Sequence, residues 1–365
     1  MYVRNRIVDG KREYCVVLTV VDNCLVLAGT EPGSTMVADF YEAIESQYNI
    51  TKQMNPSLFL GFDITRDANG DWEWSHDTYV LTAWERYESD LRKYGLWDCK
   101  RPKTPLNPKL ESAIKDPSND AKTREDVHPL YSCLLGTLMY TVGNFFVEAN
   151  HPTSILAHHL THASEVHYKA ALHVLAYLRG RVGKRFHLGR DTVKRKAGQG
   201  LWCACDADFA NARDKKSQTG FIIYYESTPI AWVSRKQASL SLSTTAAETR
   251  AATEAVKEII ILRRLLAFMG FPQTSPTIIL EDNSAVVTLS EDEGKQNSTR
   301  LKHVDIRERF VFDCCNAGIV KMVPCPTKNQ LADVLTKTMT QVDKFERLRD
   351  MVYTPPTVNE LVDTS

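Results

Sequence analysis

The chain contains 365 residues, of which 43% are hydrophobic and 25% charged, and this composition is typical of a globular protein with two or three domains. Its 45 basic and 45 acidic residues cancel, so the net charge alone does not indicate a nucleic-acid partner. No apolar run is long enough to span a membrane, and the N-terminus lacks the apolar core of a signal peptide. The nine cysteines are scattered without a Cys-x-x-Cys pair, which argues against structural zinc and favours reduced thiols in an intracellular protein.

The N-terminal region is predicted to contain two β-hairpins. Tyr14 to Ala28 form a nearly continuous apolar run, and Asp22-Asn23 interrupts it with two residues that favour turns. Ser57 to Thr65 is predicted to be a single strand. The residues Asp67-Ala-Asn-Gly70 then turn the chain back into Trp72-Glu-Trp74.

Four stretches in the first half of the chain carry apolar residues at helical spacing. They are Thr35–Tyr48, Tyr79–Tyr94, Tyr131–Phe146 and His167–Leu178, and each is predicted to be a helix. The segment Arg101–Asp126 is rich in proline and charge and poor in large apolar residues, so it is interpreted as a linker.

A group of histidines lies between the predicted helices of the middle region: His158, His159, His162 and His167. His158 and His162 are four residues apart, which places them on one face of a helix. No acid stands where a zinc-protease motif requires one, so surface or packing roles are favoured over metal binding.

Charge is concentrated just after this region. From Arg179 to Lys196 the chain carries eight basic residues, Arg185 and Lys194 among them, and one acidic residue, Asp191. A local patch of this kind can bind phosphates even when the whole chain is neutral. A solvated loop explains the same stretch equally well.

The last part of the chain changes to a pattern of strands and helices. Residues 200–234 are predicted to form a three-stranded antiparallel meander, and a helix over Ser243–Met269 follows. The remaining predicted elements are a strand over Thr277–Leu280, a helix through Leu289, a helix over His303–Cys315, a strand over Ile319–Val323, a helix over Gln330–Met339 and a disordered tail from Tyr353 to Ser365.

The stretch from Leu201 to Ala210 runs from apolar residues into two carboxylates, Asp206 and Asp208. Because alternate side chains of a strand share a face, these two acids are expected to point the same way. An aspartate within an apolar strand is costly to bury unless it meets a partner or a metal.

Three further acids lie where an α/β fold places catalytic groups, at strand ends and helix starts. Asp282 follows the strand over Thr277–Leu280, Glu248 lies on the buried stripe of the long helix, and Asp333 opens the last helix. Each also has an ordinary explanation. Thr245-Ala-Ala-Glu248 fits a capping box, and acids such as Asp282 and Asp333 are favoured at helix N-termini.

Taken together, the four acids Asp206, Glu248, Asp282 and Asp333 predict a shared metal site. Clustered carboxylates repel one another, and bound Mg²⁺ or Mn²⁺ relieves that repulsion. Two such ions about 4 Å apart can activate a water and stabilise the leaving oxygen in phosphodiester hydrolysis. We therefore expect these residues to bind divalent metal and to cut nucleic acid.

The order of these strands and helices, with acids in the order Asp, Glu, Asp, Asp, resembles ribonuclease H. Ordered strings over Tyr14–Met351 also resemble the C-terminal part of a copia-type long-terminal-repeat retrotransposon Pol polyprotein. The strings are Phe59-Leu-Gly-Phe-Asp-Ile64, Gly136-Thr-Leu-Met-Tyr140, His167-Tyr-Lys-Ala170, Tyr177-Leu-Arg-Gly180, Cys205-Asp-Ala-Asp-Phe-Ala210, Ser217-Gln-Thr-Gly-Phe221, Trp232-Val-Ser-Arg-Lys-Gln237, Ser243-Thr-Thr-Ala-Ala-Glu248, Asp282-Asn-Ser-Ala285, Lys302-His-Val-Asp305 and Ala332-Asp-Val-Leu-Thr-Lys337.

This resemblance implies an α/β fold with a ribonuclease H-like mixed five-stranded sheet and flanking helices over residues 196–345. Residues 1–105 would be a truncated reverse transcriptase palm and thumb-like region of α+β class. Residues 106–195 would be a linker and helical connection, and residues 346–365 a disordered tail.

The resemblance also implies roles for individual residues. Asp206, Glu248, Asp282 and Asp333 match the family's catalytic metal-binding acids, and the implied activity is endonucleolytic hydrolysis of RNA in RNA–DNA hybrids with two Mg²⁺ or Mn²⁺ ions. The residues expected to contact nucleic acid are Ser243, Thr244, Lys337, Arg185 and Lys194. Asp208 and His303 match family positions whose roles stay open.

The chain departs from the family pattern at several positions. The signature Tyr-Val-Asp-Asp is replaced here by Val20-Val21-Asp22-Asn23, so Asp22 is kept and the second acid becomes the neutral Asn23. Only 21 residues precede Asp22, too few for the fingers and the upstream palm strand. Ala246 replaces a family glutamate, and Glu148-Ala-Asn-His-Pro152 replaces Thr-Arg-Pro-Asp. We expect no DNA synthesis from this chain alone.

Two hypotheses of different class follow. The first is a retrotransposon-derived ribonuclease H that acts on RNA–DNA hybrids, alone or beside other parts of a Pol polyprotein. It would work without a membrane partner, in the cytoplasm, in virus-like particles or in the nucleus. The second is a catalytically inactive remnant that only binds nucleic acid. Retention of all four acids favours the first.

Overall fold

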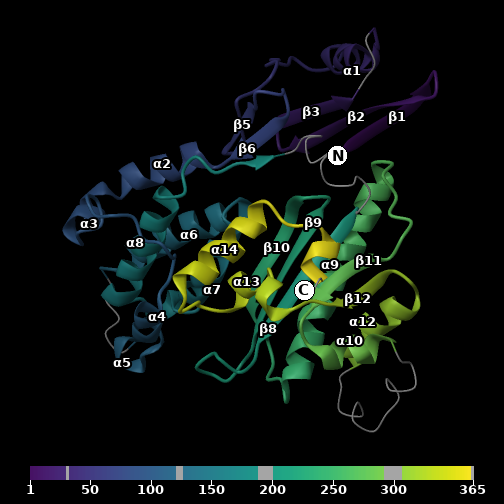
Figure 1. Ribbon diagram of the computed structural model, residues 1–365. Coiled ribbons are helices and arrows are strands. Elements are labelled where there is room, and N and C mark those ends of the chain that lie inside the picture. Colours follow the sequence, from purple (N-terminus) through teal and green to yellow (C-terminus); the bar gives the residue numbers. More distant parts are fainter. Residues whose placement is uncertain (30–32, 121–125, 188–199, 292–305, 363–365) are drawn as a thin grey trace.

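A mixed five-stranded β-sheet with helices on both faces forms the centre of the protein (Figure 1). The structure is a computed structural model that describes residues 1–29, 33–120, 126–187, 200–291 and 306–362. Two smaller sheets lie toward the N-terminal part of the chain, at the top of Figure 1. No helix among the described residues is long and apolar enough to cross a lipid bilayer.

The central sheet has the strand order β10-β9-β8-β11-β12. Its members are β8 (Leu201–Asp208), β9 (Gln218–Tyr225), β10 (Thr228–Lys236), β11 (Thr277–Glu281) and β12 (Val320–Pro324). The first three strands form the predicted antiparallel meander, and β11 and β12 run parallel to β8. The apolar β8 occupies the middle, where a strand is buried on both faces.

One face of this sheet is covered by α9 (Thr244–Phe268), α10 (Ser284–Glu291) and α12 (Ile306–Asn316). Along β8 the side chains of Cys203 and Cys205 enter this core, while those of Trp202 and Ala204 enter the core on the opposite face. The period of two is that of a β-strand. The sheet therefore separates two apolar cores.

On the opposite face α7, α13 and α14 contact the strands, and further helices from before the sheet in sequence and from after it pack around them. Within the chain they run from α2 to α8 and continue with α13 to α15: α2 (Asp77–Arg86), α3 (Glu88–Lys93), α4 (Pro108–Lys115), α5 (Pro117–Asp120), α6 (His128–Asn144), α7 (Asn150–Ala157), α8 (Glu165–Arg179), α13 (Asp333–Thr336), α14 (Val342–Tyr353) and α15 (Val358–Val362). All of these helices except α5 contribute buried residues to one core that they share with the sheet.

The N-terminal region contains a three-stranded sheet of β1 (Tyr2–Val8), β2 (Lys11–Val20) and β3 (Asn23–Gly29), followed by α1 (Met36–Glu45). The predicted hairpin is present, but its turn is Val21-Asp22 rather than Asp22-Asn23. Val20 pairs with Asn23, so Asn23 already belongs to β3, and Val21 takes the positive φ of 55° that the tight turn requires.

A second small sheet contains β4 (Leu58–Phe59), β5 (Phe62–Arg66), β6 (Trp72–Ser75) and β7 (Phe186–His187). The prediction of one strand over Ser57–Thr65 was wrong. Leu60 and Gly61 have φ of 51° and 82° and form a turn that divides the segment into two antiparallel strands. The turn at residues 67–70 and the return strand lie where the sequence placed them.

Two segments that the sequence predicted to lack structure contain helices. The proposed linker includes α4 and α5, and its Leu106 and Ile114 are buried in the shared core. The proposed disordered tail includes the end of α14 and all of α15, whose Leu361 is fully buried. In both cases a few apolar residues suffice because the core they join is supplied by distant segments. The domain borders at residues 105, 195 and 345 stay predictions.

Candidate metal centre

Asp206 is a buried acid near the C-terminal end of β8, with 1% of its surface exposed. Two side chains from the end of the chain meet its carboxylate. The hydroxyl of Thr336 donates a hydrogen bond to one oxygen, and the ammonium of Lys337 lies 3.2 Å from the other. The strand end that the sequence singled out is thus a place where a carboxylate is buried and partnered.

Close packing of α13 against the sheet brings these partners to Asp206. Asp206 pairs with Gly220 on β9. A Cβ atom on Gly220 would lie 2.5 Å from Cγ2 of Thr336 and 2.9 Å from Cβ of Leu335. Only a glycine leaves room for α13 at this distance. Gly220 was part of a matched string, but nothing in the sequence pattern indicated this role.

Glu248 lies on α9 and faces the sheet, with 4% of its surface exposed. Ser243 caps the helix by accepting the backbone N–H of Ala246 at 3.1 Å. Because Glu248 comes five residues after the cap, the capping-box explanation does not apply. Its Oε2 atom is buried and has no hydrogen-bond partner among the described residues.

Asp282 follows β11 directly and is half-buried. Leu280 of β11 pairs with Ala204 of β8 in parallel register. Extending that register by two residues brings Asp282 level with Asp206. Oxygen atoms of Asp206, Glu248 and Asp282 all lie within 4.8 Å of one another, so three distant segments meet here.

Asp333 joins the cluster through a lysine. Lys337 lies 2.8 Å from Oδ1 of Asp333 as well as 3.2 Å from Asp206, and Lys344 of α14 lies 3.0 Å from Oδ2 of Asp333. Asp333 is 1% exposed. Lys337 was predicted to contact nucleic acid, and its ammonium lies between two carboxylates. The pairing of Lys344 with Asp333 was not predicted, because their spacing in the sequence matches no known motif.

A further carboxylate, Glu281, lies beside these four acids and was also missed. It is fully buried and accepts the thiol of Cys205 at 3.3 Å and the backbone N–H of Asn283 at 3.0 Å. The predicted strand ended at Leu280, so Glu281 was left outside it next to Asp282 and received no separate interpretation, whereas the structure includes Glu281 in β11.

The electrostatics of the cluster disfavour several negative charges at once. Burial raises the pKa of Asp206 to about 6, with the charge of Lys337 opposing the shift and that of Asp333 adding to it. Burial, with the nearby Glu281 and Asp206 carboxylates, raises the pKa of Glu248 to about 10. Burial also raises the pKa of Glu281 to about 8. Such shifts arise when carboxylates are crowded away from water.

The donor set fits a divalent cation. All ligand atoms are carboxylate oxygens, which Mg²⁺ and Mn²⁺ prefer, and the unpartnered Oε2 of Glu248 is a ligand atom without a present role. A bound cation would relieve both the repulsion and the orphaned oxygen. Within the described ranges the other group of three close ligand atoms is Asp67, Glu73 and His187, next to the β5–β6 turn.

The remaining predicted site residues are dispersed. Thr244 is the first residue of α9 and, like Ser243, is exposed. Arg185 binds the carboxylate of Asp77 at 2.7 Å. Asp208 is half-buried and accepts a hydrogen bond from Asn211. Lys194 and His303 lie outside the described residues.

The two residues of the degenerate polymerase signature lie at the β2–β3 turn. Asp22 and Asn23 are both exposed, and the amide of Asn23 donates to Asp22 at 3.3 Å. His167, in contrast to these, is fully buried and caps α8: its Nδ1 accepts the backbone N–H of Ser164 at 3.1 Å. That is a packing role.

Taken together, the molecule is a mixed α/β protein with an acidic cluster at the edge of its central sheet. In sequence it is related to retrovirus-related Pol polyproteins of transposons. It is 27% identical over 94% of its length to the Pol polyprotein from transposon TNT 1-94 of Nicotiana tabacum, and 24% identical over 94% to that from transposon RE2 of Arabidopsis thaliana. The predicted resemblance is confirmed.

The chain spans about a quarter of the length of these curated relatives, 24% and 22% respectively. No protein-family model matches it. Among solved structures, the N-terminal RNase H domain of a Mycobacterium tuberculosis protein, fused to maltose-binding protein, aligns with 41% of this chain and 96% of that chain, with a TM-score of 0.29 and 13% identity.

Proposed function

We propose that the chain is a divalent-metal-dependent nuclease of ribonuclease H type, which hydrolyses the RNA strand of RNA–DNA hybrids. The observation that carries the proposal is the meeting of Asp206, Glu248 and Asp282 within 4.8 Å, beside Asp333. Relatedness to transposon Pol polyproteins supports nucleic acid as the substrate class. A hybrid of RNA and DNA is the substrate that this family resemblance implies.

Asp206, Glu248, Asp282 and Asp333 would hold Mg²⁺ or Mn²⁺, and we expect two ions. Bound there, such ions supply an activated water and stabilise the leaving oxygen of a phosphodiester. Neighbouring side chains orient two of these carboxylates: the Thr336 hydroxyl donates a hydrogen bond to one oxygen of Asp206, and Lys344 forms an ion pair with one oxygen of Asp333. Burial of both acids excludes competing water from their oxygens.

Lys337 has a distinct part in this arrangement. Its ammonium neutralises Asp206 and Asp333, at 3.2 and 2.8 Å, and these two carboxylates in turn raise its pKa against the effect of burial. A bound cation would take over this neutralisation. The lysine, on a flexible stem and 36% exposed at its side chain, would then be free to meet a substrate phosphate.

The N-terminal part is proposed to be a reverse transcriptase remnant without an intact polymerase site. Asp22 and Asn23 lie at an exposed turn, and the other described acids of residues 1–105 gather no three-ligand group with Asp22. The second candidate function, hybrid binding without cutting, is favoured by the departures around Asn23 and Ala246.

The test is cleavage of a labelled RNA–DNA hybrid in Mg²⁺ by the whole chain and by Asp206→Asn. Because Asp206 contributes to the oxygen cluster, the variant should lose at least about 100-fold in rate, or about 3 kcal/mol of barrier lowering. The matched control is Glu258→Gln, on α9 ten residues beyond Glu248, which should cut normally.

Equal cutting by wild type and Asp206→Asn would refute the site. Hybrid binding without cutting by the wild type would establish the inactive remnant instead. DNA synthesis on a primed template would overturn the view that the polymerase site is broken.

A further inference from the structure

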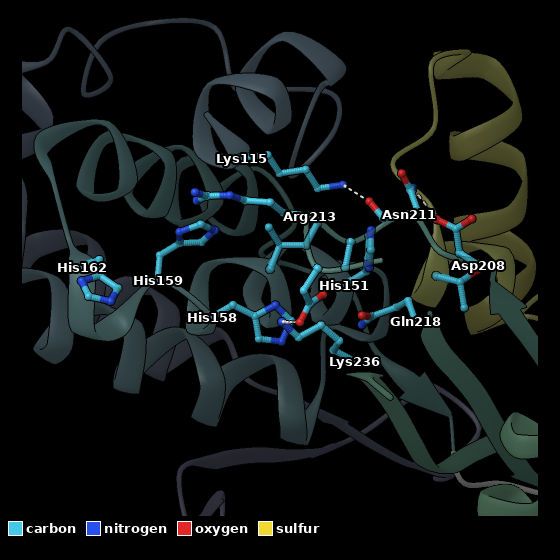
Figure 2. A pocket seen from close by; sticks show the side chains of 14 residues that line it. Lys115, His151, His158, His159, His162, Asp208, Asn211, Arg213, Gln218 and Lys236 are labelled. Carbon is cyan, nitrogen blue, oxygen red and sulfur yellow. Dashed lines mark hydrogen bonds and ion pairs between the residues drawn. The ribbon is translucent and has the colours of Figure 1, made fainter. Parts of the chain in front are cut away.

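A pocket of about 360 Å³ lies next to the metal centre, on the side of the helical layer (Figure 2). Its walls come from α4, α7 and the segment after it, the loop between β8 and β9, and β10. The pocket therefore exists only where the helical layer meets the central sheet. Its lining is rich in nitrogen: four histidines and three cationic side chains contribute to it.

Within this pocket, the side chain of His151 on α7 is the feature that indicates a bound ligand. It is 5% exposed, and neither Nδ1 nor Nε2 has a hydrogen-bond partner among the described residues. An imidazole buried without partners costs free energy unless a bound group satisfies it. Figure 2 places its ring between Asn211 and Gln218, at the wall of the pocket. Burial lowers the pKa of His151 to about 4, so the ring is neutral and offers one N–H donor.

Three cations surround the same space: Lys115, Arg213 and Lys236. The ammonium of Lys236 forms an ion pair with Oδ2 of Asp214 at 3.1 Å. This contact uses one of the three N–H donors of the ammonium. Asp208 and Asp214 also line the pocket, so among the lining side chains the cations exceed the carboxylates by one, and Glu111 pairs with Lys115 from outside the lining.

Lys115 is aimed across the pocket from α4. Its ammonium lies 2.6 Å from Glu111 of the same helix and 3.4 Å from the backbone oxygen of Asn211 on the facing loop. A single ammonium thus bridges the helical layer and the β8–β9 loop. An anion placed between them would receive its third donor.

The pocket adjoins the candidate metal centre through Thr336 and Asp208. Thr336 lines it and donates its hydroxyl to Asp206. Asp208 also lines it, two residues beyond Asp206 on the same side of β8. Two residues of a strand span roughly 7 Å. Along one strand of a nucleic acid that is the axial rise of about two nucleotides.

We propose that this pocket binds a backbone phosphate of the nucleic acid, a nucleotide or two from the bond cut at the metal centre, with His151 as hydrogen-bond donor and Lys115, Arg213 and Lys236 as counter-charges. The inference rests on the proposed nuclease function and adds to it a second anchor for the substrate. A neutral histidine donor and nearby cations are groups that bind phosphate oxygens in proteins. The helical layer would thereby help to align the substrate.

The first experiment uses thymidine 3′,5′-bisphosphate as the probe and the imidazole signals of the ¹⁵N-labelled whole chain as the readout, with EDTA present. Because His151 has no present partner, its ring nitrogen signals should shift on titration, and those of His167, which is fully bonded in the α8 cap, should not. Shifts absent from His151 at saturating bisphosphate would overturn the inference.

The second experiment measures hybrid binding in EDTA as a function of salt, for Lys115→Gln, Arg213→Gln and the control Lys109→Gln. Lys109 is exposed on the same helix as Lys115 and does not line the pocket. Each pocket variant should weaken binding about 3- to 10-fold and reduce the slope of log K against log salt by roughly 0.7 to 0.9. Retained melting temperature in each variant excludes misfolding.

The outcomes separate the pocket from the nuclease. If the wild type cuts hybrid and the pocket variants bind hybrid as tightly as Lys109→Gln does, the phosphate pocket is refuted and the nuclease proposal is not affected. Bisphosphate shifts at His151 in a protein that cuts no hybrid support the phosphate pocket and refute the nuclease.

Discussion

At the scale of single residues, Glu248 links structure to function most closely. Its Oε2 is buried without a partner, and burial with neighbouring carboxylates raises its pKa to about 10. A group in that condition destabilises the metal-free fold and would be relieved by a cation. Metal binding would therefore offset the free-energy cost of burying the Glu248 carboxyl group.

Glu248→Gln should raise the melting temperature of the protein in EDTA, because it removes a buried carboxyl that is crowded by Glu281 and Asp206. The expected gain is about 1 kcal/mol of unfolding free energy. The same variant should lose most of the stabilisation that Mg²⁺ gives the wild type. Thermal denaturation with and without Mg²⁺ measures both, and a variant that melts lower in EDTA yet keeps its full response to Mg²⁺ would contradict this reading.

We expect His76 to make stability depend on pH, at a place away from the candidate metal centre. It is fully buried between aromatic rings, its ring nitrogens have no partner among the described residues, and burial lowers its pKa to about 4. In the unfolded chain its pKa is about 6.5. Between these values the unfolded state binds more protons, so the contribution is complete above about pH 6.5 and is lost as the pH falls toward 4.

His76→Phe keeps the ring and removes the titration, so it should flatten the fall in unfolding free energy between pH 7 and 4 by up to roughly 3 kcal/mol. Urea denaturation at several pH values measures this slope. His151 and His158, whose pKa values burial lowers to about 4, should keep part of it in the variant. An unchanged slope would show that His76 is not neutral in the folded protein.

At the scale of elements, the contact between α13 and β9 decides where Asp333 and Thr336 lie. A helix of four residues has little stability of its own and depends on what it packs against. The absence of a side chain at Gly220 allows that packing, because the Cβ position lies 2.5 Å from Thr336. The geometry of the acidic cluster is thus set by a glycine on a neighbouring strand.

Gly220→Ala should displace α13 and cost about 1–3 kcal/mol of unfolding free energy, as overpacked cores do. Nuclease activity should fall further than stability alone explains, since Thr336 and Asp333 move with the helix. Gly136→Ala is the matched control: it lies in α6, meets no atom within 4 Å, and should be neutral or stabilising by about 0.5–1 kcal/mol. Equal stability and activity in both variants would refute the role of Gly220.

The elements most accurately predicted are those whose signal is local. Period-two and helical patterns over eight or more residues predict the β8–β10 meander and the long helix α9. The division of Ser57–Thr65 into β4 and β5 depends instead on a left-handed turn at Leu60, a residue that rarely adopts it. Helices α4 and α15 are short, and distant partners stabilise them.

In the candidate site, too, some residues carry a local sequence signal and others depend on distant contacts. Asp206, Glu248 and Asp282 could be predicted to converge because strand ends in parallel register share an edge. Thr336 and Lys337 lie 130 and 131 residues from Asp206, and no pattern in the sequence fixes such pairs. Lys344 and the buried Glu281 belong to the same category.

At the scale of the whole molecule, one core joins the helical layer to the central sheet. Within that layer, Glu148 joins distant helices: it is 1% exposed and receives hydrogen bonds from Tyr177 at 3.0 Å, Arg181 at 3.1 Å and Tyr353 at 2.6 Å. A buried carboxyl group with three donors thus ties α8 to α14, and Glu148 and Tyr353 lie 205 residues apart in the sequence. The candidate metal centre and the adjacent pocket both depend on the docking of this layer on the sheet, because α13 and α7 belong to the layer.

The central claim is that acids from separate segments share a divalent cation, and anomalous diffraction from crystals grown with Mn²⁺ tests it most directly. The account predicts anomalous density between Asp206, Glu248 and Asp282, with Asp333 at its side, and none there in Asp206→Asn. Density confined to Asp67, Glu73 and His187, with the Asp206 cluster empty at saturating Mn²⁺, would contradict it.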